Sequence, residues 1–100
     1  MKEHIFLKYL NNVCDHLNLT QSEIFTKNKA SHIVEARRML WKLCESRGMT
    51  PGEIRRYTQY KSNHNVHRST IVRGIEILNK KISDDNDYVH IISKLNQIDI

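Results

Sequence analysis

The fold is decided by residues 50–82, which read TPGEIRRYTQYKSNHNVHRSTIVRGIEILNKKI and predict two helices joined by an irregular polar turn. The first helix begins at a capping box, because Thr50 can accept a hydrogen bond from the first turn while Glu53 reaches back to the Thr50 backbone. Pro51 occupies the first helical position, where proline is favoured. The second helix has an apolar stripe at steps of four, three and four residues: Ile71, Ile75, Leu78 and Ile82. This spacing predicts one buried side along that helix.

The opposite side of the second helix is polar and cationic. It carries Arg68, Ser69, Val72, Arg73 and Glu76. A charged helix side in a globular domain usually faces water, so a solvated surface is the simpler interpretation. A short capped helix, a polar turn and cations at the start of the next helix are together typical of a helix-turn-helix, whose second helix contacts bases in the major groove. We therefore expect a helix-turn-helix at about residues 50–82.

The rest of the chain also has helical periodicity. Apolar spacing predicts an opening helix over about 3–17, a short turn of helix from the Thr20 cap through Phe25, and a long helix from 31 or 32 to 47 that ends at Gly48. The polar residues 26–31 predict a loop, and Ser83-Asp84-Asp85 predicts the start of a last helix. The residues expected to be buried are Phe6, Tyr9, Leu10, Val13, Leu17, Ile33, Ala36, Met39, Leu40, Leu43, Tyr88, Ile91, Ile92 and Leu95. We predict an all-α fold of five or six helices in one compact domain over residues 1–100.

Length and composition exclude several classes of function. A chain of 100 residues buries only about two-thirds of its unfolded surface and has no room for a second, catalytic domain. No apolar run is long enough for a membrane span or a signal peptide, so we expect a cytoplasmic protein that does not bind membranes. Cys14 and Cys44 fall in separate helical patterns, which is typical of reduced, packed thiols. Ser69 and His67 cannot form a nucleophilic pair, because residues two apart on a helix point in different directions. We therefore expect no enzymatic activity, no cofactor and no small-molecule substrate.

Charge is concentrated in the middle of the chain, although the net charge is only +5. Residues 27–81 hold thirteen Lys and Arg against four Glu, a balance of +9, whereas the two ends together hold three cations against seven anions, a balance of −4. A polyanion would therefore bind the middle of the chain. Such a field supplies sequence-independent affinity for nucleic acid through the release of counterions from phosphates.

Several short motifs follow one another in a distinctive order: VCDHL at 13–17, a loop near Lys27, IVEARR at 33–38, Glu53-Ile54 and STI at 69–71. Their order and spacing resemble the C-terminal DNA-binding domain of DnaA, the bacterial chromosomal replication initiator. The resemblance covers about residues 10–95. It implies a Trp repressor-like helical fold that binds double-stranded DNA.

The resemblance implies roles for particular residues. In that family an Asp-His-Ser/Thr-Thr motif opens the recognition helix, and a further base-contacting position lies four residues after the Ser or Thr. The corresponding base-contacting residues here are His67, Arg68, Ser69, Thr70 and Arg73. The family's basic loop enters the minor groove, which implies that role for Lys27, Asn28 and Lys29, although such loop charges also serve solubility. Arg37 matches a family arginine near the phosphate backbone, where we also expect Arg38, Lys42 and Lys61.

The sequence also departs from the family pattern. The family's tight turn is replaced by residues 59–66, which we align with roughly five extra residues relative to the usual three or four. His67 and Arg68 replace Asp and His, and because Arg prefers guanine O6 and N7, we expect a target other than the family's standard box. No Gly-rich phosphate loop followed by Lys-Ser or Lys-Thr is present, so the initiator's ATPase is missing. We expect recognition of an origin or operator without nucleotide hydrolysis.

Other functions stay open at this point. The turn at residues 59–66 differs from the family's turn, which favours a protein-interaction adaptor or decoy that binds a replication or transcription protein. An excess of Lys disfavours a protein interface. Structured RNA would bind to the same cationic part of the chain. Aromatic side chains on which bases could stack are missing, however, since Tyr57 and Tyr60 at a helix end are expected to pack on the core. A zinc site needs four ligands, and His64-x-x-His67 has no Cys-x-x-Cys partner, so we expect no metal.

Overall fold

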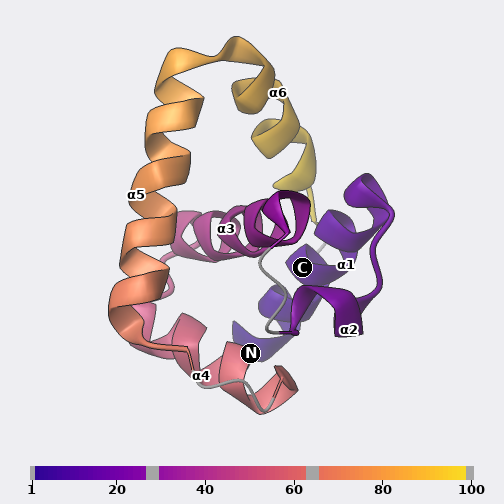
Figure 1. Cartoon of the computed structure of the whole chain (residues 1–100), viewed down its shortest axis with the longest axis vertical. Helices are drawn as coiled ribbons and strands as arrows, with labels where there is room; N and C mark the ends of the chain where they lie inside the picture. Colours follow the sequence, from indigo (N-terminus) through magenta and orange to yellow (C-terminus); the bar gives the residue numbers. More distant parts are fainter. Residues whose placement is uncertain (1, 27–29, 63–65, 99–100) are drawn as a thin grey trace.

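The computed structural model describes residues 2–26, 30–62 and 66–98, and over these ranges the protein is all-α, with no strand (Figure 1). Within them the helices are α1 (Lys2–Leu17), α2 (Gln21–Ile24), α3 (Ser31–Ser46), α4 (Pro51–Ser62), α5 (Arg68–Asp84) and α6 (Asn86–Leu95). The predicted all-α class is therefore confirmed.

Helix α3 lies at the centre and contacts all five other helices. In Figure 1, α5 stands along one side of α3, α1 and α2 lie on the other, α4 lies below, and α6 folds back from the far end of α5. The side chains between these helices form one core, whose fully buried members include Phe6, Leu10, Leu40, Ile54, Ile71 and Leu78. The core thus joins residues from α1, α3, α4 and α5.

The contact between α3 and α5 depends on the absence of a side chain at Gly74. A Cβ atom there would lie 3.0 Å from the Trp41 ring and 3.3 Å from Cγ of Arg38, closer than ordinary van der Waals contact. Trp41 is buried and donates its indole N–H to the Thr58 hydroxyl at 3.3 Å, and that hydroxyl donates to the Ile54 carbonyl at 2.8 Å. Three helices therefore meet around one indole ring.

The predicted buried stripes are confirmed on the long helices. The buried residues are Phe6, Tyr9, Leu10 and Val13 on α1, Ile33, Ala36, Met39, Leu40 and Leu43 on α3, and Ile71, Ile75 and Leu78 on α5. Leu17, Ile82, Tyr88, Ile91 and Ile92 are half-buried against this core. Cys14 and Cys44 are free and buried, as expected, and burial raises the pKa of Cys44 to about 12. The Cys44 thiol is therefore protonated and structural.

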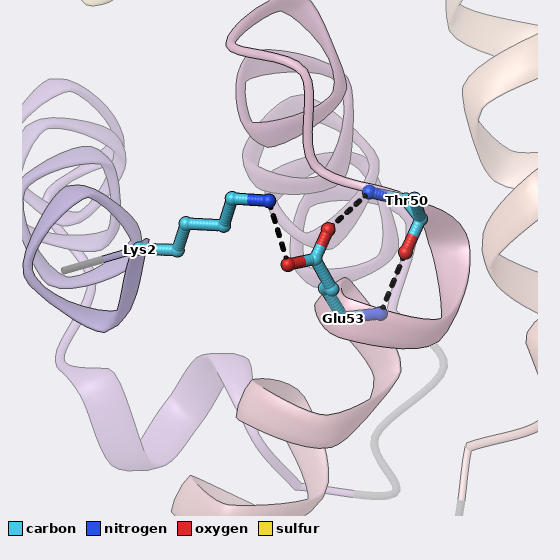
Figure 2. A network of polar contacts seen from close by, with 3 residues as sticks. All are labelled: Lys2, Thr50 and Glu53. Atoms are coloured by element: carbon cyan, nitrogen blue, oxygen red, sulfur yellow. Dashed lines mark hydrogen bonds and ion pairs between the residues drawn. The ribbon is translucent and has the colours of Figure 1, made fainter.

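The predicted Thr20 cap of α2 and the predicted capping box of α4 are confirmed, and α2 has a full capping box as well. At α2 the Thr20 N–H donates to the Glu23 carboxylate at 3.0 Å, and the Glu23 N–H donates to the Thr20 hydroxyl at 3.3 Å. At α4 the Thr50 N–H donates to the Glu53 carboxylate at 3.0 Å, and the Glu53 N–H donates to the Thr50 hydroxyl at 3.2 Å (Figure 2). Figure 2 also shows the Lys2 ammonium on the same carboxylate, at 2.8 Å. Glu53 therefore links α1 to the start of α4.

The turn predicted at residues 59–66 is wrong in extent. Helix α4 continues through Ser62, so residues 59–62 are helical. Residues 63–65 lie outside the described ranges. No Gly or Pro stands in this polar run to end the helix, and its polarity alone does not break helical hydrogen bonding.

The junction between α5 and α6 also differs slightly from the prediction. Ser83 and Asp84 belong to the last turn of α5 rather than to the start of the next helix. Asp85 alone caps α6, because its carboxylate accepts the Asp87 N–H at 2.9 Å. The predicted start at residues 83–85 therefore contains the observed cap, at its last position.

Leu95 is the one fully buried residue of helix α6, while Tyr88, Ile91 and Ile92 pack half-buried on the core. Polar contacts join both ends of the helix to α1 and α3. The Tyr88 hydroxyl and the Lys81 ammonium both donate to Oε2 of Glu35, at 2.7 and 2.6 Å. Burial raises the pKa of Glu35, but these two hydrogen bonds outweigh burial and the pKa is lowered. Its Oε1 is buried without a hydrogen-bond partner in the described part of the chain. At the other end of α6 the Asn12 amide donates to the Leu95 carbonyl at 2.9 Å.

We expect Glu53→Gln to remove part of the acid sensitivity of the fold. Hydrogen bonds from Lys2 and from the Thr50 backbone lower the pKa of Glu53 from 4.5 to about 2. A carboxylate with a lowered folded-state pKa adds stability above its unfolded pKa and loses it as the pH falls through the folded value. The free energy of unfolding should therefore fall between pH 4.5 and about 2, and less steeply in the Gln variant. Urea unfolding across that pH range measures the difference.

The control for this prediction is Glu76→Gln, at an exposed position of α5 with no hydrogen-bond partner in the described ranges. It should leave the loss of stability in acid as steep as in the native chain. Identical pH profiles for Glu53→Gln and the native chain would contradict the prediction.

Candidate nucleic-acid interface

The N-terminal end of α5 brings together the residues predicted to contact bases. His67, Arg68, Ser69, Thr70 and Arg73 are all exposed. His67 precedes the helix, where its carbonyl accepts the Thr70 N–H at 3.0 Å and its imidazole makes no capping hydrogen bond. The same turns bury Ile71, Gly74 and Ile75 on the opposite side. The five predicted residues therefore share one helix end, and solvent reaches their side chains.

Two arginines at this end have no polar partner among residues 2–26, 30–62 and 66–98. Neither Arg68 nor Arg73 makes a hydrogen bond or an ion pair with any of the described residues. Ser69 stands four residues before Arg73 and therefore lies on the same side of the helix. The positive end of the α5 dipole adds to the cationic field at this position. The arrangement is suited to an anionic ligand.

Arg68 also lies against the first turn of α4. A Cβ atom at Gly52 would lie 3.0 Å from Nη2 of Arg68, so the guanidinium rests where a side chain would otherwise stand. Arg55 of α4 donates its Nε to the Val66 carbonyl at 2.9 Å, just ahead of α5. These contacts fix the start of α5 on α4. Counting charges along the sequence does not identify this role of Arg55, because Arg55 bonds to a backbone carbonyl and not to a charged side chain.

Arg37, predicted to lie near a phosphate backbone, is engaged within the protein. Its Nε donates to the Ile24 carbonyl at 2.6 Å and its Nη2 donates to the Thr26 carbonyl. It is half-buried, and burial lowers the pKa of its guanidinium. Arg37 therefore holds the end of α2 against α3. The predicted minor-groove residues Lys27, Asn28 and Lys29 lie outside the described ranges.

The other predicted backbone contacts, Arg38, Lys42 and Lys61, differ in their surroundings. Arg38 is half-buried, and its Cγ lies beside Gly74, on the buried side of α5. The Lys42 ammonium forms an ion pair with Glu45 at 3.1 Å. Lys61 is exposed in the last turn of α4, where it lines a hollow with Gln21, Ser22 and Phe25. Of these three cations, Lys61 is the most exposed.

Lys80 belongs to the outward side of α5 but was not among the predicted contacts. It is exposed and stands seven residues after Arg73, about two helical turns along the same side. No hydrogen bond or ion pair holds it within the described ranges. The seven-residue spacing was visible in the sequence and could have identified it.

The two tyrosines of α4 differ in their environment. Tyr57 packs its ring on Phe6 with centroids 5.6 Å apart, as expected for a core contact. Tyr60 is 77% exposed, so the expectation that it packs on the core is wrong. It follows Thr58, the last buried residue of α4, in a turn that extends beyond the core.

No three His, Cys, Asp or Glu side chains come together as metal ligands within the described ranges. His64, which the sequence places three residues before His67, lies outside them. None of the described helices combines the length and the apolar character needed to cross a bilayer.

Comparison of the chain with protein-family models, with curated proteins and with solved structures finds no match. The resemblance to the DNA-binding domain of DnaA therefore rests on the order and spacing of the sequence motifs.

We expect Gly52→Ala to reposition Arg68 without unfolding the chain. The added Cβ would displace the end of a flexible side chain, while Ala in a helix is favoured over Gly by up to about 1 kcal/mol. The variant should unfold at the same or a higher temperature, and the NMR resonance of the Arg68 Nε–H should shift. Gly48→Ala is the control, because Gly48 has φ +88° and no atom within 4 Å. It should cost about 1 kcal/mol through backbone strain alone. An unshifted Arg68 resonance in Gly52→Ala would contradict the prediction.

Proposed function

We propose that this chain binds double-stranded DNA sequence-specifically, with α4 and α5 as a helix-turn-helix and the N-terminal end of α5 in the major groove. The observation that carries the proposal is the pair of exposed arginines, Arg68 and Arg73, which flank Ser69 in the sequence of the first two turns of α5 and pair with no side chain in the described part of the chain. A charge without an intramolecular partner is fully available to phosphates and base edges. No compensating ion pair must be broken for it to bind.

The attachment of α5 to α4 supports this proposal. The contacts of Arg68 with the Gly52 turn and of Arg55 with the Val66 carbonyl hold the two helices as one unit. A preorganised pair of helices loses little conformational entropy when it docks on DNA. The first helix can then rest on the DNA backbone while the second enters the groove.

The side chains at this end suit different parts of a DNA duplex. The planar guanidinium of Arg73 matches O6 and N7 of guanine in a bidentate contact. Ser69 can donate to or accept from a neighbouring base, and His67 and Thr70 flank it. Lys61 and Lys80 are exposed cations beyond this end and suit phosphates, which position the protein without specifying the sequence.

The motif order supports a narrower form of the proposal, namely origin or operator recognition of the DnaA kind in the cytoplasm. Ser69 and Thr70, which match the family's recognition motif, stand in the first turn of α5. The chain has no phosphate-binding Gly-rich loop, so this form involves no nucleotide hydrolysis.

A protein-interaction adaptor is the second candidate, and the exposure of Tyr60 favours it. Tyrosine is enriched in protein interfaces, and this ring is 77% exposed. A replication or transcription protein would then be the partner. The Lys61 ammonium, 5.9 Å from the ring centre, disfavours an apolar partner at this point.

Selection from a random duplex pool, followed by affinity measurements over a range of salt, tests DNA binding directly. We expect an enriched motif and a linear fall of log affinity with log salt, with a slope of roughly −0.9 for each phosphate contacted. Several contacts should give a slope of several units. An unenriched pool with a flat salt response would reject DNA binding and favour the adaptor.

Replacing Arg73 with Ala tests base readout. The variant should lose about 1–3 kcal/mol of binding free energy and relax the preference at one base pair, because a bidentate contact to guanine is removed. Lys80→Ala, on the same side of α5, is the matched comparison and should weaken binding to cognate and scrambled duplexes alike. Equal losses on both duplexes for Arg73→Ala would exclude base readout by Arg73.

A further inference from the structure

Three large apolar side chains are exposed in the described part of the chain: Tyr60, Val72 and Val89, with exposed fractions of 77%, 36% and 43%. Tyr60 is in the last turn of α4, and Val89 is on α6. Val72 alone lies on the outward side of α5, in its second turn. Single exposed apolar residues are common on protein surfaces, so the argument depends on what surrounds Val72.

Polar residues surround Val72 on that side of the helix. Ser69 precedes it by three residues and Glu76 follows it by four, so both lie about one turn away, and Arg73 is its immediate neighbour. All three are exposed. The core contacts of α5 are made by Ile71 and Ile75, so Val72 contributes no fully buried side chain to the fold. An apolar contact is thus presented at the edge of the side proposed to face bases, between the buried residues of α5 and the exposed Ser69 and Arg73.

The major groove offers one apolar group to such a side chain. Among the four bases, thymine alone presents a methyl group there, at C5, beside hydrogen-bond donors and acceptors. Val72 has no donor or acceptor and cannot bind phosphate. Its branched side chain is nearly confined to one rotamer in a helix, so ordering it against a ligand costs little entropy.

We propose that Val72 reads a thymine by packing on its C5 methyl group. The inference rests on the proposed binding of DNA through α5. It adds an apolar contact to the polar readout by Arg73 and Ser69, and it discriminates against any base pair that lacks this methyl group.

The test uses the full chain and the duplex motif returned by selection. Each thymidine of the motif is replaced in turn by deoxyuridine, which lacks only the methyl group. One replacement should weaken binding of the native chain roughly fourfold, the value expected for one buried methyl group. The same replacement should not change the affinity of Val72→Ala. 5-Bromodeoxyuridine at that position, with bromine in place of the methyl group, should restore native affinity.

Val89→Ala is the matched control, because Val89 is the other exposed valine and lies on α6. It should keep the native sensitivity to deoxyuridine. Val72→Ala should remain folded, since Ala has the higher helix propensity and position 72 is outside the core. Thermal unfolding followed by circular dichroism checks both variants.

The outcomes separate the inference from the proposed function. A motif without thymine, a native chain insensitive to every replacement, or equal sensitivity in Val72→Ala and the native chain would overturn thymine readout while DNA binding stands. Failure to select any motif, with an affinity that does not respond to salt, would overturn DNA binding itself and thymine readout with it.

Discussion

The close approach of α5 to α3 at Gly74 is the constraint on which the rest of the structure depends. The Trp41 ring occupies the space of the missing side chain, and the Thr58 hydroxyl joins the indole to α4. Since one side of α5 is committed to this packing, the opposite side must face outward. The exposure of Arg73 and its neighbours is therefore a consequence of how the core packs, and any ligand of α5 must meet that side.

The sequence predicted those structural features whose causes are local. Apolar spacing identified the buried sides of the long helices, and the Thr50 and Glu53 pair identified the start of α4, because a capping box involves residues three apart. The end of α4 was predicted too early in the chain, because no local signal marks it. The run after Gln59 is polar but contains neither Gly nor Pro, and nothing local in it stops a helix. Tyr60 was misjudged with it, since its exposure follows from the length of α4.

The candidate site also combines features that local sequence determines with features that depend on the folded neighbours of a residue. The exposure of the residues proposed to face bases could be predicted, because they share one helix end, where spacing alone decides the side. The cations assigned to phosphates required knowledge of their neighbours. Arg37 donates to carbonyls at the end of α2, and the stem of Arg38 lies against Gly74. Counting charge along the chain does not distinguish a cation engaged within the fold from one available to a ligand. Lys80 is different, because its seven-residue spacing from Arg73 already places it on the exposed side of the same helix.

The sparse burial of α6 has a consequence for how the molecule fluctuates. Helix α6 has one fully buried residue and three half-buried ones, and polar contacts join it to Glu35 at one end and Asn12 at the other, so it buries less apolar surface than α3. Native-state hydrogen exchange should therefore find its amides opening at a lower free energy than those in the centre of α3, as a separate cooperative unit. In Figure 1 this helix follows the C-terminal end of α5, and Arg68 is at the opposite, N-terminal end of α5. Subglobal unfolding there would leave the arginine-bearing end of α5 in place.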